Sequence, residues 1–480
     1  MKLKYLSMLM LGASLTGLTA CNDFLDKVPE SAVTPDAYFM AEADLAAYSI
    51  NLYNFNTIPT GQYGLSVFAD NNHTDDQVAM NSSTRWVPGQ WLVGSATNDD
   101  KRGEPWNFFQ IRDCNYFLDQ VLPKYEAGQI TGSEANIRHY IGEVYMLRAY
   151  AYFQKLQDIG DCPIIETALP DVEETLVEAS KRRPRHMVAR FILSDLDKAI
   201  SFLSDKTPGG KNRISKDAAY LLRSRVALYE GTWLKHHDGT AFVPGGPGWP
   251  GSDSEGYNAQ TEISYFLGEA MKSAKVVGDK MVGNLVNNTD TPEGMSPALA
   301  SINPYYTMFC DNDMEGYSEV LLWREYSQSL GITHNLQKEA QHSGGGTGYS
   351  RGLVNSFLMR NGLPIYAAGS GYDPEWEKQG VAATLQDRDS RIQLFTKKDG
   401  DVESYLTDGT FTTVDFNWVV NGNNETRMTT GFAIKKGKHY DVYQQITHHV
   451  GTTGSLVFRG TEAMLNYMEA CYELNGSIDA

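Results

Sequence analysis

The side chains of this chain that could do chemistry do not form a recognisable catalytic motif. Neither HExxH nor GxSxG occurs in the 480 residues, which removes the usual zinc-protease helix and the nucleophile elbow. The pattern GxGxxG occurs once, as Gly246-Pro-Gly248-Trp-Pro-Gly251. Its two prolines, with no strand before it and no helix after it, exclude a dinucleotide-binding turn. The 59 acidic residues are too many for any pair to be assigned as a glycosidase dyad without a measured separation.

Metal-binding patterns are similarly incomplete. The segment Asp311-Asn-Asp313-Met-Glu315-Gly316 resembles the start of a calcium loop, but its twelfth position is Leu322 instead of Glu. We therefore predict a turn there. His139 and Glu143 are four residues apart on one predicted helix, which is typical of a surface pair. No two cysteines have CxxC spacing, which disfavours a zinc or redox site. Buried free thiols are expected at Cys114, Cys162, Cys310 and Cys471.

The cysteine at position 21 has a different context. Lys2 and Lys4 precede a short apolar run that closes on Leu18-Thr19-Ala20-Cys21, an arrangement typical of an export signal. The run is shorter than the roughly 20 residues of a membrane-spanning helix. A cysteine directly after Leu-Thr-Ala also fits a bacterial lipobox. We predict that residues 1–20 are removed as a lipoprotein signal peptide and that Cys21 is acylated, anchoring the protein to a membrane.

Composition limits the partners that the chain can have. The net charge is −18, and removal of residues 1–20 takes away two lysines and no acid, which makes it −20. Such an acidic balance disfavours nucleic acid, whose phosphates require clustered Lys and Arg. No second long apolar run follows the signal, so no other membrane span is predicted.

The elements that must position any site are mainly helices. Thr34 and Pro35 are expected to begin the first helix, and Ser215 is expected to cap another. Apolar residues at helical spacing predict the remaining helices, of which the one over 263–279 has the weakest pattern. These helices cover residues 104–122, 134–158, 186–203, 215–235, 263–279 and 458–474.

Long loops and limited β-structure separate these helices. The helix pairs resemble tetratricopeptide packing, although their spacing is too uneven for a strict 34-residue repeat. The segment 402–420 predicts a small β-hairpin. Loops longer than about 12–15 residues without regular structure are uncommon unless they are functional. The fold class is therefore mainly α, with a tetratricopeptide-like helix-pair scaffold, long irregular loops and a minor hairpin or sheet.

Several segments, in order, resemble the SusD/RagB-like outer-membrane lipoproteins of Bacteroidetes. The mature start Cys21-Asn-Asp-Phe-Leu-Asp is followed by the helix and turn of residues 141–165. Further similar segments cover residues 225–237, 318–326, 353–365, 388–392 and 457–476. The resemblance implies one SusD-like domain over residues 21–480, with an N-terminal lobe at about 21–235 and a C-terminal lobe at about 260–480. Family members usually continue past the late helix, so we expect a chain truncated at its C-terminus.

The resemblance also implies a function. Such proteins sit on the cell surface, anchored in the outer membrane, as lids over a SusC-like TonB-dependent transporter, to which they deliver oligosaccharides. Some family members bind peptides instead, which is the first alternative; an exported glycoside hydrolase is the second. No catalysis and no cofactor are implied, although some members carry a structural calcium ion.

Aromatic and polar loop residues are the candidates for sugar binding. A sugar ring has a C–H face on which an aromatic ring can stack, and a rim of hydroxyls that polar groups bind. Two loops offer such residues, and Trp249 and Trp376 are further loop aromatics. Trp106, Trp233 and Trp323 are expected in the core. The predicted ligand-binding residues are Arg85, Trp86, Trp91, Asn98, Tyr305 and Tyr306, with Gln90 and Asp99 beside them.

Overall fold

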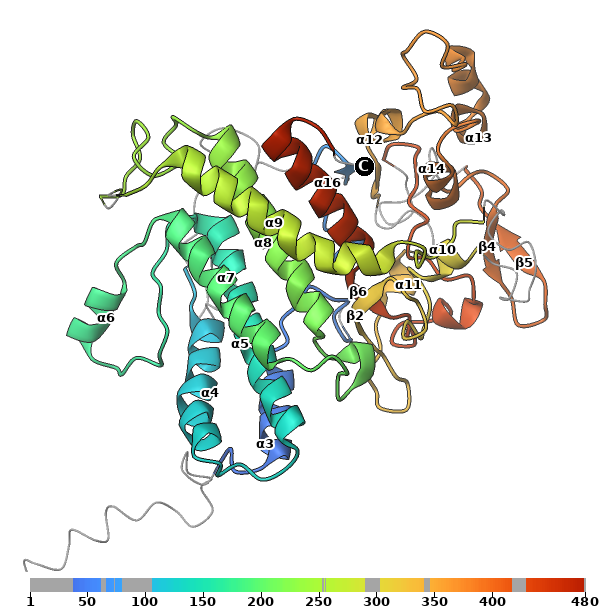
Figure 1. Cartoon of the computed structure of the whole chain (residues 1–480). Helices are drawn as coiled ribbons and strands as arrows, with labels where there is room; N and C mark the ends of the chain where they lie inside the picture. Colours follow the sequence, from blue (N-terminus) through green and yellow to red (C-terminus); the bar gives the residue numbers. More distant parts are fainter. Residues whose placement is uncertain are drawn as a thin grey trace, which may run out of the picture.

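A computed structural model of the chain consists mainly of helices, with a few short strands (Figure 1). The confirmed fold class is mainly α, with helix pairs as the scaffold and irregular segments around them. The structure describes residues 38–61, 66–72, 74–79, 106–252, 254, 256–289, 303–340, 346–416 and 429–478.

The scaffold is a layered array of long helices. Helix α5 packs against α3, α4 and α7; α7 packs against α8, α8 against α9, and α16 against both α8 and α9. Figure 1 shows this array with the later short elements gathered beside one end of α9 and α16. The scaffold helices are α3 (Glu42–Asn51), α4 (Phe109–Glu126), α5 (Glu134–Ile159), α7 (Arg185–Phe202), α8 (Lys216–His236), α9 (Ala259–Met281) and α16 (Thr461–Asn475).

Local sequence signals explain several helix starts. The hydroxyl of Ser215 accepts a hydrogen bond from the Ala218 amide at 3.1 Å, which confirms it as the N-cap of α8. Asn258 caps α9 in the same way, through the Thr261 amide at 2.9 Å. The predicted helix at 134–158 corresponds to α5. Thr34 itself lies outside the described residues, but the helix predicted to start there begins too early, because residues 38–41 are not helical and α3 starts at Glu42.

Arginine–carboxylate pairs cross most of the helix interfaces. The Arg148 guanidinium on α5 donates to both oxygens of Asp195 on α7, at 2.6 and 2.8 Å. Asp195 has no exposed surface, so the pair must compensate a large desolvation cost. Equivalent pairs join α7 to α8, α7 to α9, α8 to α9 and α8 to α16. These pairs are Arg185–Glu230, Arg190–Glu262, Arg223–Glu269 and Arg225–Glu462.

The prediction of a surface pair at His139 and Glu143 is wrong. Both side chains are completely buried, with His139 Nε2 3.3 Å from Glu143 Oε1. Arg213 reaches the same carboxylate at 2.6 Å, and the Ser49 hydroxyl donates to it at 2.9 Å. Hydrogen bonds from distant segments therefore satisfy a charge that helical spacing alone would place at the surface.

The strands form only two-stranded antiparallel pairs among the described residues. Strand β4 (Val402–Tyr405) pairs with β5 (Phe411–Thr413), which confirms the predicted hairpin. Strand β2 (Val320–Arg324) pairs with β6 (Ser455–Arg459), and β1 (Gln77–Val78) with β3 (Gly348–Tyr349). The predicted helix at 458–474 is therefore too early at its start, because Phe458 belongs to β6.

Short helices complete the described elements. The α-helices are α6 (Glu173–Ala179), α10 (Pro304–Thr307), α11 (Leu336–Glu339), α12 (Arg351–Ser356), α13 (Val381–Thr384) and α14 (Ser390–Phe395). The 3₁₀ helices are η1 (Ser66–Ala69), η2 (Gly210–Asn212), η4 (Pro374–Gln379) and η5 (Val442–Gln444).

Burial tests the remaining predictions for cysteine and tryptophan. Cys114, Cys162, Cys310 and Cys471 are buried free thiols, as predicted. Trp323 is 3% exposed and Trp233 packs against the main core. Trp106 is 43% exposed, so its assignment to the core is wrong. It precedes α4, and its ring contacts the Arg182 guanidinium at 4.7 Å. No described helix is long and apolar enough to cross a membrane.

Candidate functional site

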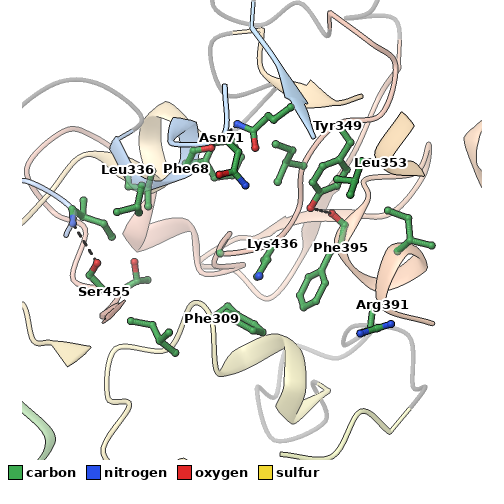
Figure 2. A pocket seen from close by; sticks show the side chains of 18 of the residues that line it. Phe68, Asn71, Phe309, Leu336, Tyr349, Leu353, Arg391, Phe395, Lys436 and Ser455 are labelled. Carbon is green, nitrogen blue, oxygen red and sulfur yellow. Dashed lines mark hydrogen bonds between the residues drawn. The ribbon is translucent and has the colours of Figure 1, made fainter. Parts of the chain in front are cut away.

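A cavity of about 450 Å³ lies among the irregular segments of the C-terminal half and the loop that contains η1 (Figure 2). Its volume is in the range of small-molecule sites, about 300–1,000 Å³. Aromatic and aliphatic side chains form most of its wall, and a few polar groups face the same space. The aromatic wall residues are Phe68, Phe309, Tyr349, Phe357 and Phe395; the charged or amide-bearing ones are Asn71, Gln77, Arg391 and Lys436.

Gln77 fixes the loop that forms one side of this cavity. Its side-chain amide donates to the Phe68 carbonyl and to the Asn72 side chain, each at 2.8 Å. The same residue starts β1, which pairs with Tyr349 in β3. Two segments that are about 270 residues apart in the sequence are therefore held together at the cavity wall. The amide of Asn71 is exposed and has no side-chain partner among the described residues.

A tight turn presents Lys436 to the cavity. The Lys438 amide donates to the Lys435 carbonyl at 3.1 Å, and Gly437 has φ of 83°. This is the pattern of a type II turn, in which glycine is favoured at the third position because φ is positive. The hydroxyl of Tyr306 lies 3.0 Å from the Lys435 carbonyl oxygen and 2.7 Å from that of Lys438. The hydroxyl of the buried Tyr306 therefore holds the two ends of the turn together.

The Lys436 ammonium lies over aromatic rings. Its Nζ is 4.3 Å from the centre of the Phe309 ring and 5.6 Å from that of Phe395, within cation–π range. The side chain is exposed and lines the cavity. Desolvation by the surrounding fold, together with the nearby Arg459 guanidinium, lowers the pKa of Lys436 to about 8. The ammonium therefore remains mostly charged at pH 7.

A second cation lines the cavity at Arg391. Its guanidinium donates to Asp389, with the closest contact at 2.6 Å, and this carboxylate also caps α14 through the Arg391 amide at 2.8 Å. Arg391 is therefore neutralised locally, whereas Lys436 has no ion-pair or hydrogen-bond partner in the described part of the chain. No Asp or Glu is found among the described residues that line the cavity.

The predicted site residues have different placements. Tyr305 packs against two residues of the cavity wall. The centre of its ring is 5.6 Å from that of Phe309 and 5.7 Å from that of Phe395. Tyr306 is completely buried between Phe395 and Tyr440. A side chain without exposed surface has no face to offer a ligand, so in this structure Tyr306 is a support for the Lys436 turn. Arg85, Trp86, Trp91 and Asn98, like Cys21, lie outside the described residues.

The two other loop tryptophans lie away from this cavity wall. The Trp249 indole N–H donates to Asp161 Oδ2 at 2.8 Å, and the Trp376 ring meets that of Tyr372 edge-on at 5.7 Å. Neither tryptophan is among the residues that line the cavity.

A second cavity, of about 530 Å³, lies beside α3 and the β2–β6 pair. It is lined by Tyr53, Phe55 and Leu330, among others, and by Arg324 and Glu325, whose charges are opposite. The Arg324 guanidinium is already bound by the Thr57 and Thr60 hydroxyls, at 3.0 and 2.9 Å. The guanidinium that lines this cavity is therefore already hydrogen-bonded, whereas the Lys436 ammonium of the first cavity forms no hydrogen bond among the described residues.

The described residues do not form a metal centre. No group of three or more His, Cys, Asp or Glu side chains among them is arranged to hold an ion. The segment that begins at Asp311 forms turns. The Asp311 carboxylate accepts a hydrogen bond from the Asp313 amide at 3.3 Å, and the Asp313 carboxylate accepts one from the Glu315 amide at 2.9 Å. This agrees with the predicted turn. A structural calcium ion, which the resemblance allows, stays a prediction.

Comparison with known proteins gives matches to two parts of the chain. Residues 23–228 match a family described as "starch-binding associating with outer membrane", and residues 314–480 match the SusD family. The chain is a SusD/RagB-like protein. The resemblance of this SusD/RagB-like protein that was inferred from sequence segments is therefore confirmed.

Individual relatives are distant. Two SusD-like proteins of Formosa agariphila are 26% and 24% identical to this chain, over 45% and 48% of its length. The chain spans less than half of their lengths, at 41% and 44%. Among solved structures, a SusD-like protein of Bacteroides fragilis has a TM-score of 0.59 at 20% identity, over 93% of this chain and 78% of that one. A SusD homologue of Bacteroides thetaiotaomicron has a TM-score of 0.55 at 14% identity, over 94% of this chain and 77% of that one. These structures support the fold alone.

Sequence reasoning missed the residues that form this cavity. Phe309, Phe395, Arg391 and Lys436 were not among the candidates. The one local signal was the run Lys435-Lys436-Gly437-Lys438, in which three cations flank a glycine in an acidic chain. Such a run usually indicates a solvated turn, and only the three-dimensional structure places one of its lysines against aromatic rings.

Proposed function

We propose that this SusD/RagB-like protein captures oligosaccharides at the outer membrane and delivers them to a SusC-like TonB-dependent transporter, without catalysing a reaction. The observation that carries the proposal is the family match, whose description names starch binding and the outer membrane. The aromatic cavity is a suitable site, because its apolar walls surround the Asn71 amide and the Lys436 ammonium, for which the described part of the chain provides no side-chain hydrogen-bond partner.

The chemistry of the cavity suits a sugar ring. Apolar surfaces from Phe68 and Tyr349 can cover the C–H face of a ring, while the Asn71 amide is available to its hydroxyls. Arg85, Trp86, Trp91 and Asn98 remain predicted ligand residues. Gln77, at the cavity wall, is only eight positions before Arg85 in the sequence.

Calorimetry of the full chain in mild detergent, against a panel of oligosaccharides and a panel of peptides, tests the binding. We expect heat only with oligosaccharides. Trp86→Ala or Trp91→Ala should weaken sugar binding by about 1–3 kcal/mol if that ring is a stacking platform, and Trp249→Ala serves as the control for loss of a loop tryptophan. Binding of peptides alone would favour the peptide-binding alternative, and turnover of a glycan would favour a hydrolase.

We also propose that the protein is anchored by lipid on Cys21 and faces the cell exterior. Two or more acyl chains hold a protein stably, because each buried methylene contributes about 0.8 kcal/mol. Cys21→Ala should move the protein from the membrane fraction to the soluble fraction, with Cys471→Ala as a control that removes a thiol elsewhere. Retention of the Cys21→Ala protein in the membrane would contradict the anchor. Co-purification of a TonB-dependent transporter with the wild-type protein tests the delivery step.

A further inference from the structure

One cation in the cavity has no counter-charge. Lys436 is exposed to the cavity, with its ammonium over Phe309. Within the described ranges, no carboxylate lies within ion-pair distance of it and no hydrogen bond is formed by its Nζ. The contacts of this ammonium among the described residues are with the Phe309 and Phe395 rings, so its charge is available to a ligand in the cavity.

The two flanking lysines show the contrast. Lys435 Nζ is 2.9 Å from Asp401, and the Lys438 ammonium forms an ion pair with Glu403. Both lysines are 1% exposed. Three lysines of one turn thus divide into two that are buried and paired, and one that faces a cavity and is unpaired. A purely structural turn would not require this division, because Lys436 could point to solvent or be a neutral residue.

The charge of the cavity is also opposite to that of the protein. The chain has a net charge of −18, yet the described wall residues include no acid, and of their two cations Arg391 is paired with Asp389 while Lys436 is not paired. Low-dielectric walls concentrate the field of such charges and favour a ligand of the opposite sign. A neutral sugar could offer the ammonium only hydroxyl oxygens as acceptors, whereas a carboxylate or sulfate would also supply a counter-charge.

We propose that this cavity selects acidic oligosaccharides, in which a carboxylate or sulfate group forms an ion pair with Lys436 while the sugar ring packs against the aromatic wall. This inference rests on the proposed function and specifies its ligand class. Tyr306 is a positioning residue in this arrangement, because its hydroxyl holds the two ends of the turn.

Calorimetry with matched probes tests the proposal. The probes are uronate-bearing oligosaccharides, sulfated oligosaccharides, neutral oligosaccharides of the same lengths and acidic peptides. The variants are Lys436→Met, Lys436→Arg and Lys181→Met; the last removes one charge just after the protruding helix α6, on the other side of the molecule (Figure 1). Thermal unfolding of each variant checks that it is folded.

We expect at least one acidic oligosaccharide to bind more tightly than its neutral counterpart. Lys436→Met should weaken that binding roughly 10- to 100-fold, since a hydrogen bond to a charged group is lost. Lys436→Arg should retain most of the affinity and Lys181→Met all of it. Wild-type affinity should fall as the pH rises from 7 to 9, because the ammonium loses its proton near pH 8; the arginine variant should not show this fall.

The failures are distinguishable. Binding of neutral sugars with no preference for acidic ones, or equal acidic-sugar affinities for Lys436→Met and wild type, overturns the acidic preference and leaves the proposed function standing. Lys436-dependent binding of acidic peptides alone overturns the sugar class. An absence of binding to any oligosaccharide by the folded wild-type protein overturns both proposals.

Discussion

Replacement of Tyr306 by phenylalanine separates a supporting role from a ligand-contacting role. The ring is completely buried and stacks on Tyr440 with a centroid distance of 5.3 Å. Its hydroxyl has a single proton, and the nearer acceptor is the Lys438 carbonyl oxygen at 2.7 Å. The farther acceptor, the Lys435 carbonyl at 3.0 Å, also receives the Lys438 amide. The substitution therefore deprives one buried carbonyl of its donor and keeps the ring packing.

The expected loss of stability follows from the one hydrogen bond that the substitution removes. A buried polar group left without a partner costs about 1–3 kcal/mol, and the isosteric ring adds no large cavity. We expect Tyr306→Phe to lower the free energy of unfolding by about 1–3 kcal/mol in equilibrium urea titrations. Tyr305→Phe is the matched control, because the Tyr305 hydroxyl has no partner among the described residues; it should change the value by less than about 0.5 kcal/mol. Equal stability of both variants and wild type would refute the role of Tyr306 as the anchor of the turn.

Two further predictions concern the buried charges of the scaffold. Arg148→Met should destabilise the protein by about 3–5 kcal/mol, because Asp195 would remain buried without its bidentate partner; urea titration measures this, and Asp195→Leu in the same chain should restore part of the loss. For Glu143, burial raises the carboxyl pKa, but hydrogen bonds from Arg213 and His139 outweigh it and lower the pKa below the ordinary 4.5. The resulting stability is present above pH 4.5 and is lost as the pH falls through the folded-state pKa. Glu143→Gln should therefore reduce the acid dependence of the unfolding midpoint below pH 4.5; an unchanged dependence would contradict this.

The long helices could be predicted because their signals are local. Apolar spacing and the Ser215 cap place α8, and spacing alone places α5 to within a residue of its end. Phe458 shows where local reasoning fails: its strand is stabilised by pairing with β2, more than 100 residues earlier, and no pattern within the segment reports that partner. The prediction that Trp106 lies in the core is wrong for a related reason, because Trp106 precedes α4 and its exposure depends on how the chain enters that helix.

Buried charges were the other source of error. Helical spacing correctly placed His139 and Glu143 on one face of α5, but it could not show that Arg213 approaches that face from a loop 70 residues later in the chain. The same limitation applies to the cavity. Its wall takes single residues from many short segments between Ile58 and Leu456, so no continuous motif marks it, and a lysine in a turn is indistinguishable from a solvated one until the rings beneath it are placed.

The physical basis of stability differs between the scaffold and the site. The scaffold helices share one large apolar cluster, whereas the residues around the Lys436 turn belong to small clusters, one of which contains Tyr306, Phe395 and Tyr440. Segments with little shared apolar surface depend on individual polar contacts, such as those of Gln77 and Tyr306, and open more readily than a large core. A binding site built in this way can adjust its wall without disturbing the helices. It follows that substitutions at the polar contacts should alter the site locally, whereas substitutions at the buried ion pairs should affect the whole fold.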